Sequence, residues 1–220
     1  GPTCPQIAAI GDSFFGASFA PSPSVDHGLP YLSTFQLYRR GEWAVTHPLG
    51  YQRNQAEYLN SMLIGGLSAV NEFKGLIAQE FGPNEEYAYF AGGCGGQYYR
   101  QPYWNPPPTF LHEWTRTLFY LPSADKLSDT VIVFDRTNAE NPRNLGQLER
   151  YLAADRERIL SAPANKQWII HSPVAPSVGP EGIAWSTPGG QQVRVSTLLP
   201  AAQKRVVLNE ADLWGNTVAL

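Results

Sequence analysis

The sequence predicts an all-β protein whose antiparallel strands form a sandwich with long loops and at most one or two short helices. Short apolar or alternating runs follow one another along the chain, with Gly, Pro, Asn and Asp between them. Many runs are rich in the β-branched and aromatic residues that suit a pleated, half-buried surface. The 220 residues, 43% of them hydrophobic, suffice for one sizeable core, so we expect a single domain over residues 1–220.

The predicted strands are Gln6–Ile10, Thr34–Arg39, Glu42–Thr46, Ser61–Gly65, Phe73–Glu80, Tyr87–Ala91, Trp114–Leu121, Thr130–Arg136, Gln167–Ser172, Gln191–Leu199 and Arg205–Asn209. Arg40-Gly41 lies between two of them and predicts a hairpin. We expect Phe35, Leu37, Val131, Val133, Ile169 and Val195 to be buried between the sheets. Apolar residues near helical spacing predict one short surface helix within 147–160. Segments 92–108 and 173–188 are expected to be long loops.

Charge and apolar content exclude two classes of partner. The chain has 16 Lys+Arg against 19 Asp+Glu, a net charge of −3 that is too mild to indicate nucleic acid. No run approaches the roughly 18 apolar residues that a membrane-spanning helix needs, and the first residues lack the features of a signal peptide. Cys4 and Cys94 allow either one disulfide, in an oxidising compartment, or two free thiols.

Several stretches, in order, carry a resemblance to a known family. Residues 26–51 run DHGLPYLSTFQLYRRGEWAVTHPLGY, and EYLNSMLIGG follows at 57–66. Later come WTRTLFY at 114–120, TVIVFDR at 130–136, KQWIIHS at 166–172 and STLLP at 196–200. This ordered set resembles the β-sandwich domain of the heparinase II/III-like polysaccharide lyases. In that family a stretch H-x-H-x-D precedes F-x-L-Y-x-x-G-E-W, then Gly-Tyr and His-Asn follow, and strands of the forms tR-x-v-x-y-l, vVvDR, k-x-w-l-l-H and tLLP come later.

The resemblance implies a second domain and a reaction. In the family an α/α-toroid precedes the sandwich, and the active site lies in the cleft between them. This chain contains no toroid, so we expect a fragment of a larger polysaccharide-processing protein, with weak or no turnover alone. The implied reaction is β-elimination from a uronic acid. A base removes the C5 proton, a cation or hydrogen-bond donors stabilise the enolate, and an acid protonates the departing oxygen.

Two residues inherit candidate catalytic roles from the resemblance. His27 stands where the family stretch has its first histidine, and Tyr51 stands in the Gly-Tyr dipeptide. The imidazole would act as base or hydrogen-bond donor, and the phenol would face the same anionic sugar. The other interpretation of His27, a surface-loop residue beside Asp26, stays open.

The departures from the family pattern concern its metal ligands. Leu29 and Tyr31 replace the second His and the Asp of the stretch, and Leu59 replaces the His of His-Asn. A leucine cannot coordinate a metal. The four histidines, His27, His47, His112 and His171, lack the close spacing of a zinc site. We therefore expect no bound metal, and no cofactor is implied.

The candidate substrate-binding residues are Arg39, Arg40, Asn60, Tyr99 and Trp104. Arg39 and Arg40 can grip a carboxylate through paired hydrogen bonds, or they are the solvated end of a hairpin. Tyr99 and Trp104 belong to a loop that either stacks on sugar rings or is anchored at the core edge. We also expect Asn60 and one of the two arginines to face one surface together with the candidate catalytic pair.

The Gly11-Asp12-Ser13 block matches the start of GDS-type esterases, but the partner motif D-x-x-H is absent from the chain. We interpret the match as chance and expect Ser13 in a loop. Two functions remain. The first is the sandwich portion of a polysaccharide lyase that acts on acidic polysaccharide or oligosaccharide, in the periplasm or secreted. The second is a non-catalytic carbohydrate-binding or structural sandwich.

Overall fold

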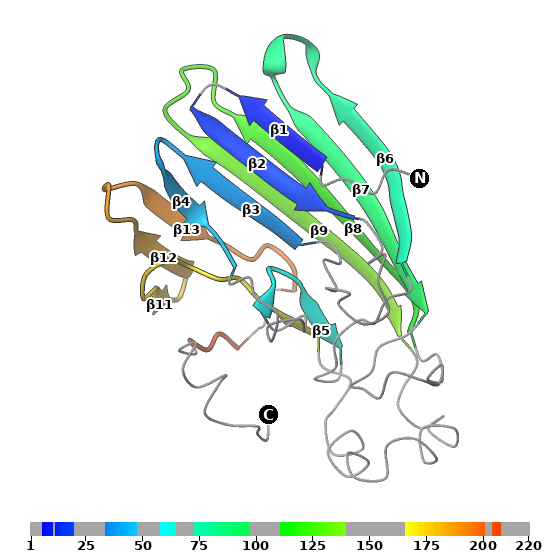
Figure 1. Ribbon diagram of the computed structural model, residues 1–220. Helices are drawn as coiled ribbons and strands as arrows, with labels where there is room; N and C mark the ends of the chain where they lie inside the picture. Colours follow the sequence, from blue (N-terminus) through cyan, green and yellow to red (C-terminus); the bar gives the residue numbers. More distant parts are fainter. Residues whose placement is uncertain are drawn as a thin grey trace, which may run out of the picture.

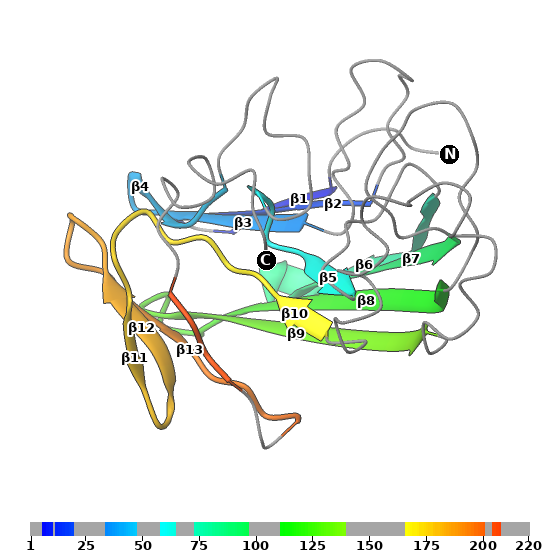
Figure 2. The ribbon, with the colours of Figure 1, turned by 90° about the horizontal axis from the view of Figure 1, so that it is seen from below.

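The computed structural model describes residues 6–10, 12–19, 34–47, 58–64, 73–96, 111–139, 166–200 and 204–207. Two antiparallel four-stranded sheets form the main layers (Figures 1 and 2). The first contains β1 (Gln6–Ile10), β2 (Ser13–Ser18), β3 (Thr34–Arg39) and β4 (Glu42–Val45), in that order. The second contains β6 (Phe73–Phe81), β7 (Ala88–Gly96), β8 (Leu111–Pro122) and β9 (Asp129–Ala139), also in order. The predicted all-β sandwich is confirmed for the described residues.

Two smaller antiparallel sheets accompany these layers. One pairs β5 (Met62–Ile64) with β10 (Lys166–Trp168), and the other contains β11 (Ser177–Gly179), β12 (Gly182–Ser186) and β13 (Gln192–Val195). The buried Trp185 of β12 donates from its indole Nε1 to the Ala44 carbonyl of β4 at 3.0 Å, which ties this sheet to the first layer. One complete 3₁₀ turn, η2 (Pro83–Glu85), lies among the described residues.

The core lies between the two layers, because alternate residues of facing strands point inward. The residues that β2, β3, β7 and β8 contribute to the hydrophobic core cluster are Phe15, Ala17, Phe35, Leu37, Ala88, Phe90, Leu118 and Tyr120. The Phe15 ring stacks on Tyr120 with centroids 5.2 Å apart and on Phe90 at 6.2 Å, so it bridges both sheets. Large rings packed in this way remove apolar surface of both layers from water.

The predicted burial of the core residues is confirmed in part. Phe35 and Leu37 are buried, and Val131, Val133 and Val195 are partly buried against the core. Ile169 is half-buried and lies outside this cluster, while its neighbour Ile170 packs against it. The predicted hairpin is confirmed, because Arg40 and Gly41 have φ values of 46° and 87°, as a two-residue type I′ turn requires.

Three expectations for the strands and loops were wrong. Ser13 begins β2 and does not lie in a loop; Gly16, in the middle of this strand, weakened the signal. The expected loop 173–188 contains the whole of β11 and β12, because prolines next to short strands hid them. Residues 204–207 form no strand, although a strand was expected from Arg205 onward. The predicted helix within 147–160 lies outside the described residues.

A further expectation was also wrong at its start: the predicted loop 92–108 begins inside a strand, because β7 continues to Gly96. A glycine is needed inside this strand at Gly92, which faces the core opposite Phe19. A Cβ atom built on Gly92 would lie 1.9 Å from Cδ1 of the Phe19 ring. The strand therefore uses glycine for close approach of a buried ring and not for a turn.

Candidate functional site

The structure describes three of the predicted site residues, Arg39, Arg40 and Asn60. The other four, His27, Tyr51, Tyr99 and Trp104, lie outside the described residues, so their roles stay predictions. The three described residues belong to two polar networks. We call them the Asn60 network and the Arg39 network.

The Asn60 network begins with a fully buried side-chain amide. Asn60 Nδ2 donates to the Phe35 carbonyl at 2.7 Å and to the Thr46 carbonyl at 2.9 Å. Its Oδ1 accepts from the backbone N–H of His171 at 2.6 Å. The amide therefore satisfies backbone groups of β3, of the segment after β4, and of the segment after β10. In this structure it positions backbone and presents no surface to a ligand.

A buried arginine extends the Asn60 network to the second layer. Arg116, with 1% of its surface exposed, donates from Nη1 to the Asn60 carbonyl at 2.8 Å. Its Nε and Nη2 donate to the two carboxylate oxygens of Asp135, each at 2.7 Å. Trp114 Nε1 donates to the same carboxylate at 3.0 Å. This bidentate ion pair ties β8 to β9.

Two histidines lie beside the Asn60 network. Thr46 and His171 form an isolated antiparallel bridge, with the Thr46 N–H donating to the His171 carbonyl at 3.4 Å. His47 follows directly and is buried, with 6% of its surface exposed. His171 is half-buried.

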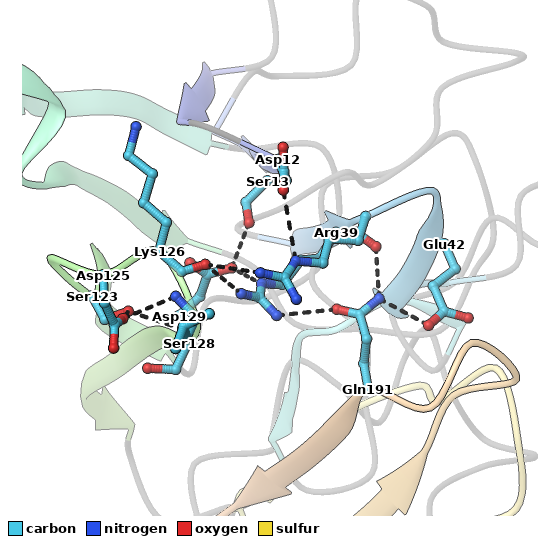
Figure 3. Close-up of polar contacts among 12 residues, drawn as sticks. Asp12, Ser13, Arg39, Glu42, Ser123, Asp125, Lys126, Ser128, Asp129 and Gln191 are labelled. Carbon is cyan, nitrogen blue, oxygen red and sulfur yellow. Dashed lines mark hydrogen bonds and ion pairs between the residues drawn. The ribbon is translucent and has the colours of Figure 1, made fainter.

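The Arg39 network lies at the other end of β3, where three sheets meet (Figure 3). Arg39 Nε lies 2.8 Å from Asp129 Oδ2, and the two side chains are 11% and 5% exposed. The Ser13 hydroxyl donates to the same Oδ2 at 2.6 Å. Arg39 also donates to the Lys126 carbonyl at 2.9 Å, and Gln191 Nε2 donates to the Arg39 carbonyl at 2.7 Å. The guanidinium is thus held by protein groups on several sides.

Glu42 links the Arg39 network to the turn before β13. Its carboxylate accepts hydrogen bonds from the Thr187 hydroxyl, from the Gly189 N–H at 2.8 Å and from Gln191 Nε2 at 2.8 Å. These bonds, that from Thr187 first, lower the pKa of the Glu42 carboxyl. On the core side, burial raises the pKa of the Tyr120 hydroxyl, near Ser13 and Asp129, to about 12.

Arg40 is the more exposed of the two predicted arginines. Its side chain is 44% exposed, and Nε lies 3.6 Å from a carboxylate oxygen of the exposed Asp12. Its Nη2 donates to the Lys126 carbonyl at 3.3 Å. These contacts match the interpretation of Arg40 as the solvated end of a hairpin, and such exposed pairs contribute little to stability.

Arg39 and Asn60 do not share a surface. Asn60 bonds to Thr34 and Phe35 at the start of β3, whereas Arg39 ends that strand. Five residues of extended chain span roughly 17 Å. The expected common surface of Asn60 with Arg39 or Arg40 is therefore not present in the described residues.

The chemistry available in these two networks is limited. The Ser13 hydroxyl donates to a carboxylate that is already paired with Arg39, and no imidazole takes part in the contacts that the structure describes there. Activation of a serine requires such a base. Among the described residues, no three His, Cys, Asp or Glu side chains gather into a group able to hold a metal ion. In the same part of the chain, no helix is long and apolar enough to span a bilayer.

Comparison of the chain with protein-family models and with curated proteins found no match. The functional assignment therefore depends on the sequence motifs and on the geometry above. Sequence reasoning missed the Ser13–Asp129 link and the position of Gln191 beside Arg39. No local sequence pattern predicts either contact, because the residues of the two pairs are 116 and 152 positions apart in the chain.

Proposed function

We propose that this chain is the β-sandwich portion of a polysaccharide lyase that acts by β-elimination on uronic-acid-containing polysaccharide. In this proposal the sandwich works with an α/α-toroid domain in the periplasm or outside the cell, and the acidic glycan lies in the cleft between the two domains. His27 and Tyr51 are the candidate base and acid.

The observation that supports the proposal is which residues form the Asn60 network. Its groups come from five of the separate stretches on which the resemblance depends: Phe35, Asn60, Arg116, Asp135 and His171. The Asn60 side chain alone joins groups 25 and 111 residues away in the chain. A chance set of short motifs has no reason to meet in one hydrogen-bonded network. A shared fold would require it, because buried polar groups must find partners.

A second candidate function is a non-catalytic carbohydrate-binding sandwich. Leu59 favours it, because this residue stands where the family has a histidine and is 2% exposed. A buried leucine removes both the ligand and the open space that a metal at this position would need. The two candidates agree on the ligand and differ on turnover.

The test combines binding and turnover measurements on the 220-residue chain. Oligosaccharides of alginate, polygalacturonate and heparin are the acidic probes, and a cello-oligosaccharide is the neutral control. We expect binding of at least one acidic probe, and weaker binding by His27→Ala with Tyr51→Phe. Tyr38→Phe is the matched control, because it removes a phenol hydroxyl from a half-buried tyrosine of β3 and should leave affinity unchanged.

Turnover separates the two candidates. Elimination creates an unsaturated uronate that absorbs in the ultraviolet, so product formation is measured directly. Slow product formation that His27→Ala abolishes supports the lyase. Binding without any product, also after addition of a toroid domain from a lyase of the family, supports the non-catalytic function. If the chain binds none of the acidic probes, both candidate functions are refuted.

A further inference from the structure

The outer face of the second sheet carries a cluster of large apolar side chains. In β8, Trp114, Arg116, Leu118 and Tyr120 point inward, so Thr117 and Phe119 point to the opposite side. This side faces away from the β1–β4 layer (Figure 2). The residues that we call the outer aromatic face are Tyr87, Tyr89, Phe119, Ile132 and Phe134.

Strand register places these side chains next to one another. Tyr89 pairs with Phe119, and Phe119 pairs with Ile132, so one row crosses three adjacent strands. The Phe119 ring contacts Tyr87 and Tyr89, with centroids 5.3 Å and 6.1 Å away. Phe134 lies in the next row, opposite Thr117. With about 4.8 Å between strands and about 7 Å between rows, the cluster covers an area suited to two or three pyranose rings.

The cluster is open to solvent at its β9 side. Phe134 is 59% exposed and Ile132 is 46% exposed. Isolated exposed apolar residues are ordinary, but several contiguous ones on a flat sheet indicate an interaction surface. Large exposed rings also have a specific partner chemistry, since the C–H face of a sugar packs on an aromatic face.

The described charged residues of this face lie at its two opposite edges, a cation on β9 and an anion on β6. Arg136 is exposed and stands two residues after Phe134, on the same face of β9. Glu80, which accepts a hydrogen bond from the Tyr87 hydroxyl, lies on β6 at the other edge of the sheet, so Arg136 is the charged group beside Phe134 among the described residues. Hydroxyls of Thr115, Thr117 and Thr130 lie on the same side and add hydrogen-bonding groups between the rings.

We propose that the outer aromatic face is a second glycan-binding surface, on which sugar rings stack while Arg136 pairs with a uronate carboxylate. The proposal rests on the proposed function for the class of ligand, but it places the contact on the sheet face remote from β3 and both polar networks. It lets the protein hold an acidic polysaccharide chain at a distance from the cleft. No bond is made or broken at this surface.

The experiment measures affinity of the 220-residue chain for the acidic oligosaccharides and the neutral control. Phe134→Ala should weaken binding about tenfold, the factor that loss of one good stacking contact predicts. Arg136→Gln should weaken binding of acidic probes and leave any binding of the neutral probe unchanged. Trp43→Ala is the matched control, because Trp43 is an aromatic residue, 38% exposed, on the other sheet. Thermal unfolding of each variant checks that the fold is retained.

The possible outcomes separate a failure of the outer aromatic face from a failure of the proposed function. If the wild-type chain binds and Phe134→Ala and Arg136→Gln bind equally well, the outer aromatic face is refuted and the proposed function stands. If the wild-type chain binds no acidic probe, both fail. If the chain self-associates and Phe134→Ala abolishes association, the face is a contact between copies, and the glycan surface is again refuted.

Discussion

Removal of the Asn60 side chain tests whether the Asn60 network holds the sandwich together. Asn60→Ala deletes three hydrogen bonds, to the carbonyls of Phe35 and Thr46 and from the N–H of His171. Each bond contributes roughly 1 kcal/mol, and each buried group left without a partner costs about 1–3 kcal/mol. We expect a loss of about 3–5 kcal/mol, a large share of the roughly 5–15 kcal/mol that stabilises a typical domain.

Urea unfolding followed by tryptophan fluorescence measures this loss. Asn60→Leu separates the hydrogen bonds from the cavity, because leucine fills a similar volume and makes no such bonds. If the bonds dominate, Asn60→Leu is no more stable than Asn60→Ala. Gln79→Ala, at an exposed position of β6, should change stability by less than about 0.5 kcal/mol. A loss below about 1 kcal/mol in Asn60→Ala would refute the argument that this amide organises three segments.

Three further predictions concern the core and its polar groups. Gly92→Ala should destabilise by about 1–3 kcal/mol or more, because the new methyl group overlaps the buried Phe19 ring. Arg116→Met should cost about 3–5 kcal/mol, since it leaves the Asp135 carboxylate without its charged partner; chemical unfolding measures both losses. Burial raises the pKa of Tyr120 to about 12. The protonated hydroxyl of Tyr120 therefore makes its full contribution to the free energy of unfolding below about pH 10, the ordinary pKa of tyrosine, and this contribution is lost as pH rises through about 12. Tyr120→Phe lacks the hydroxyl, so it should show a smaller loss of thermal stability at alkaline pH.

The controls for these predictions use matched positions. Gly179→Ala places a methyl group where nothing lies within 4 Å, so it should be nearly neutral. Equal losses for Gly92→Ala and Gly179→Ala would contradict the steric explanation. Adding Asp135→Leu to Arg116→Met should restore part of the stability, because no charge then stays buried. An unchanged loss in the double variant would mean that the charge is not the cause.

The strands of this fold were predictable wherever local signals agreed. β1 and β3 have the predicted bounds, and Arg40-Gly41 identified the hairpin that joins β3 to β4. The continuous apolar run at 131–134 also carried information that the strand prediction did not use. Val131 and Val133 pack on the core, while Ile132 and Phe134 lie on the outer face. A strand that is apolar on both sides signals a second contact surface.

The site was less predictable, because its contacts are long-range. The sequence predicted Arg39 and Asn60 as candidate substrate-binding residues, but it did not predict their hydrogen-bond and ion-pair partners. Asp129 is 90 positions from Arg39 in the numbering, and its role depends on how two sheets face each other. Register within a hairpin follows from a turn, whereas contact between layers follows from the whole fold. The motifs therefore picked out polar residues but did not predict the internal contacts that the structure shows for them.

Under the proposed function, the Asn60 network gives a physical reason why this chain would keep some residues of the family pattern and lack others. Asn60, Arg116 and Asp135 bond inside the protein, so loss of any one leaves buried polar groups without partners and weakens the fold. A metal ligand in an open cleft has no such constraint, because its loss costs activity and little stability. Leu59, which the resemblance places at the position of a family histidine, is buried with 2% of its surface exposed. Under the proposed function, the internal network would then persist whether or not turnover does, which is why the stability of Asn60→Ala and the elimination assay on His27→Ala must be measured separately.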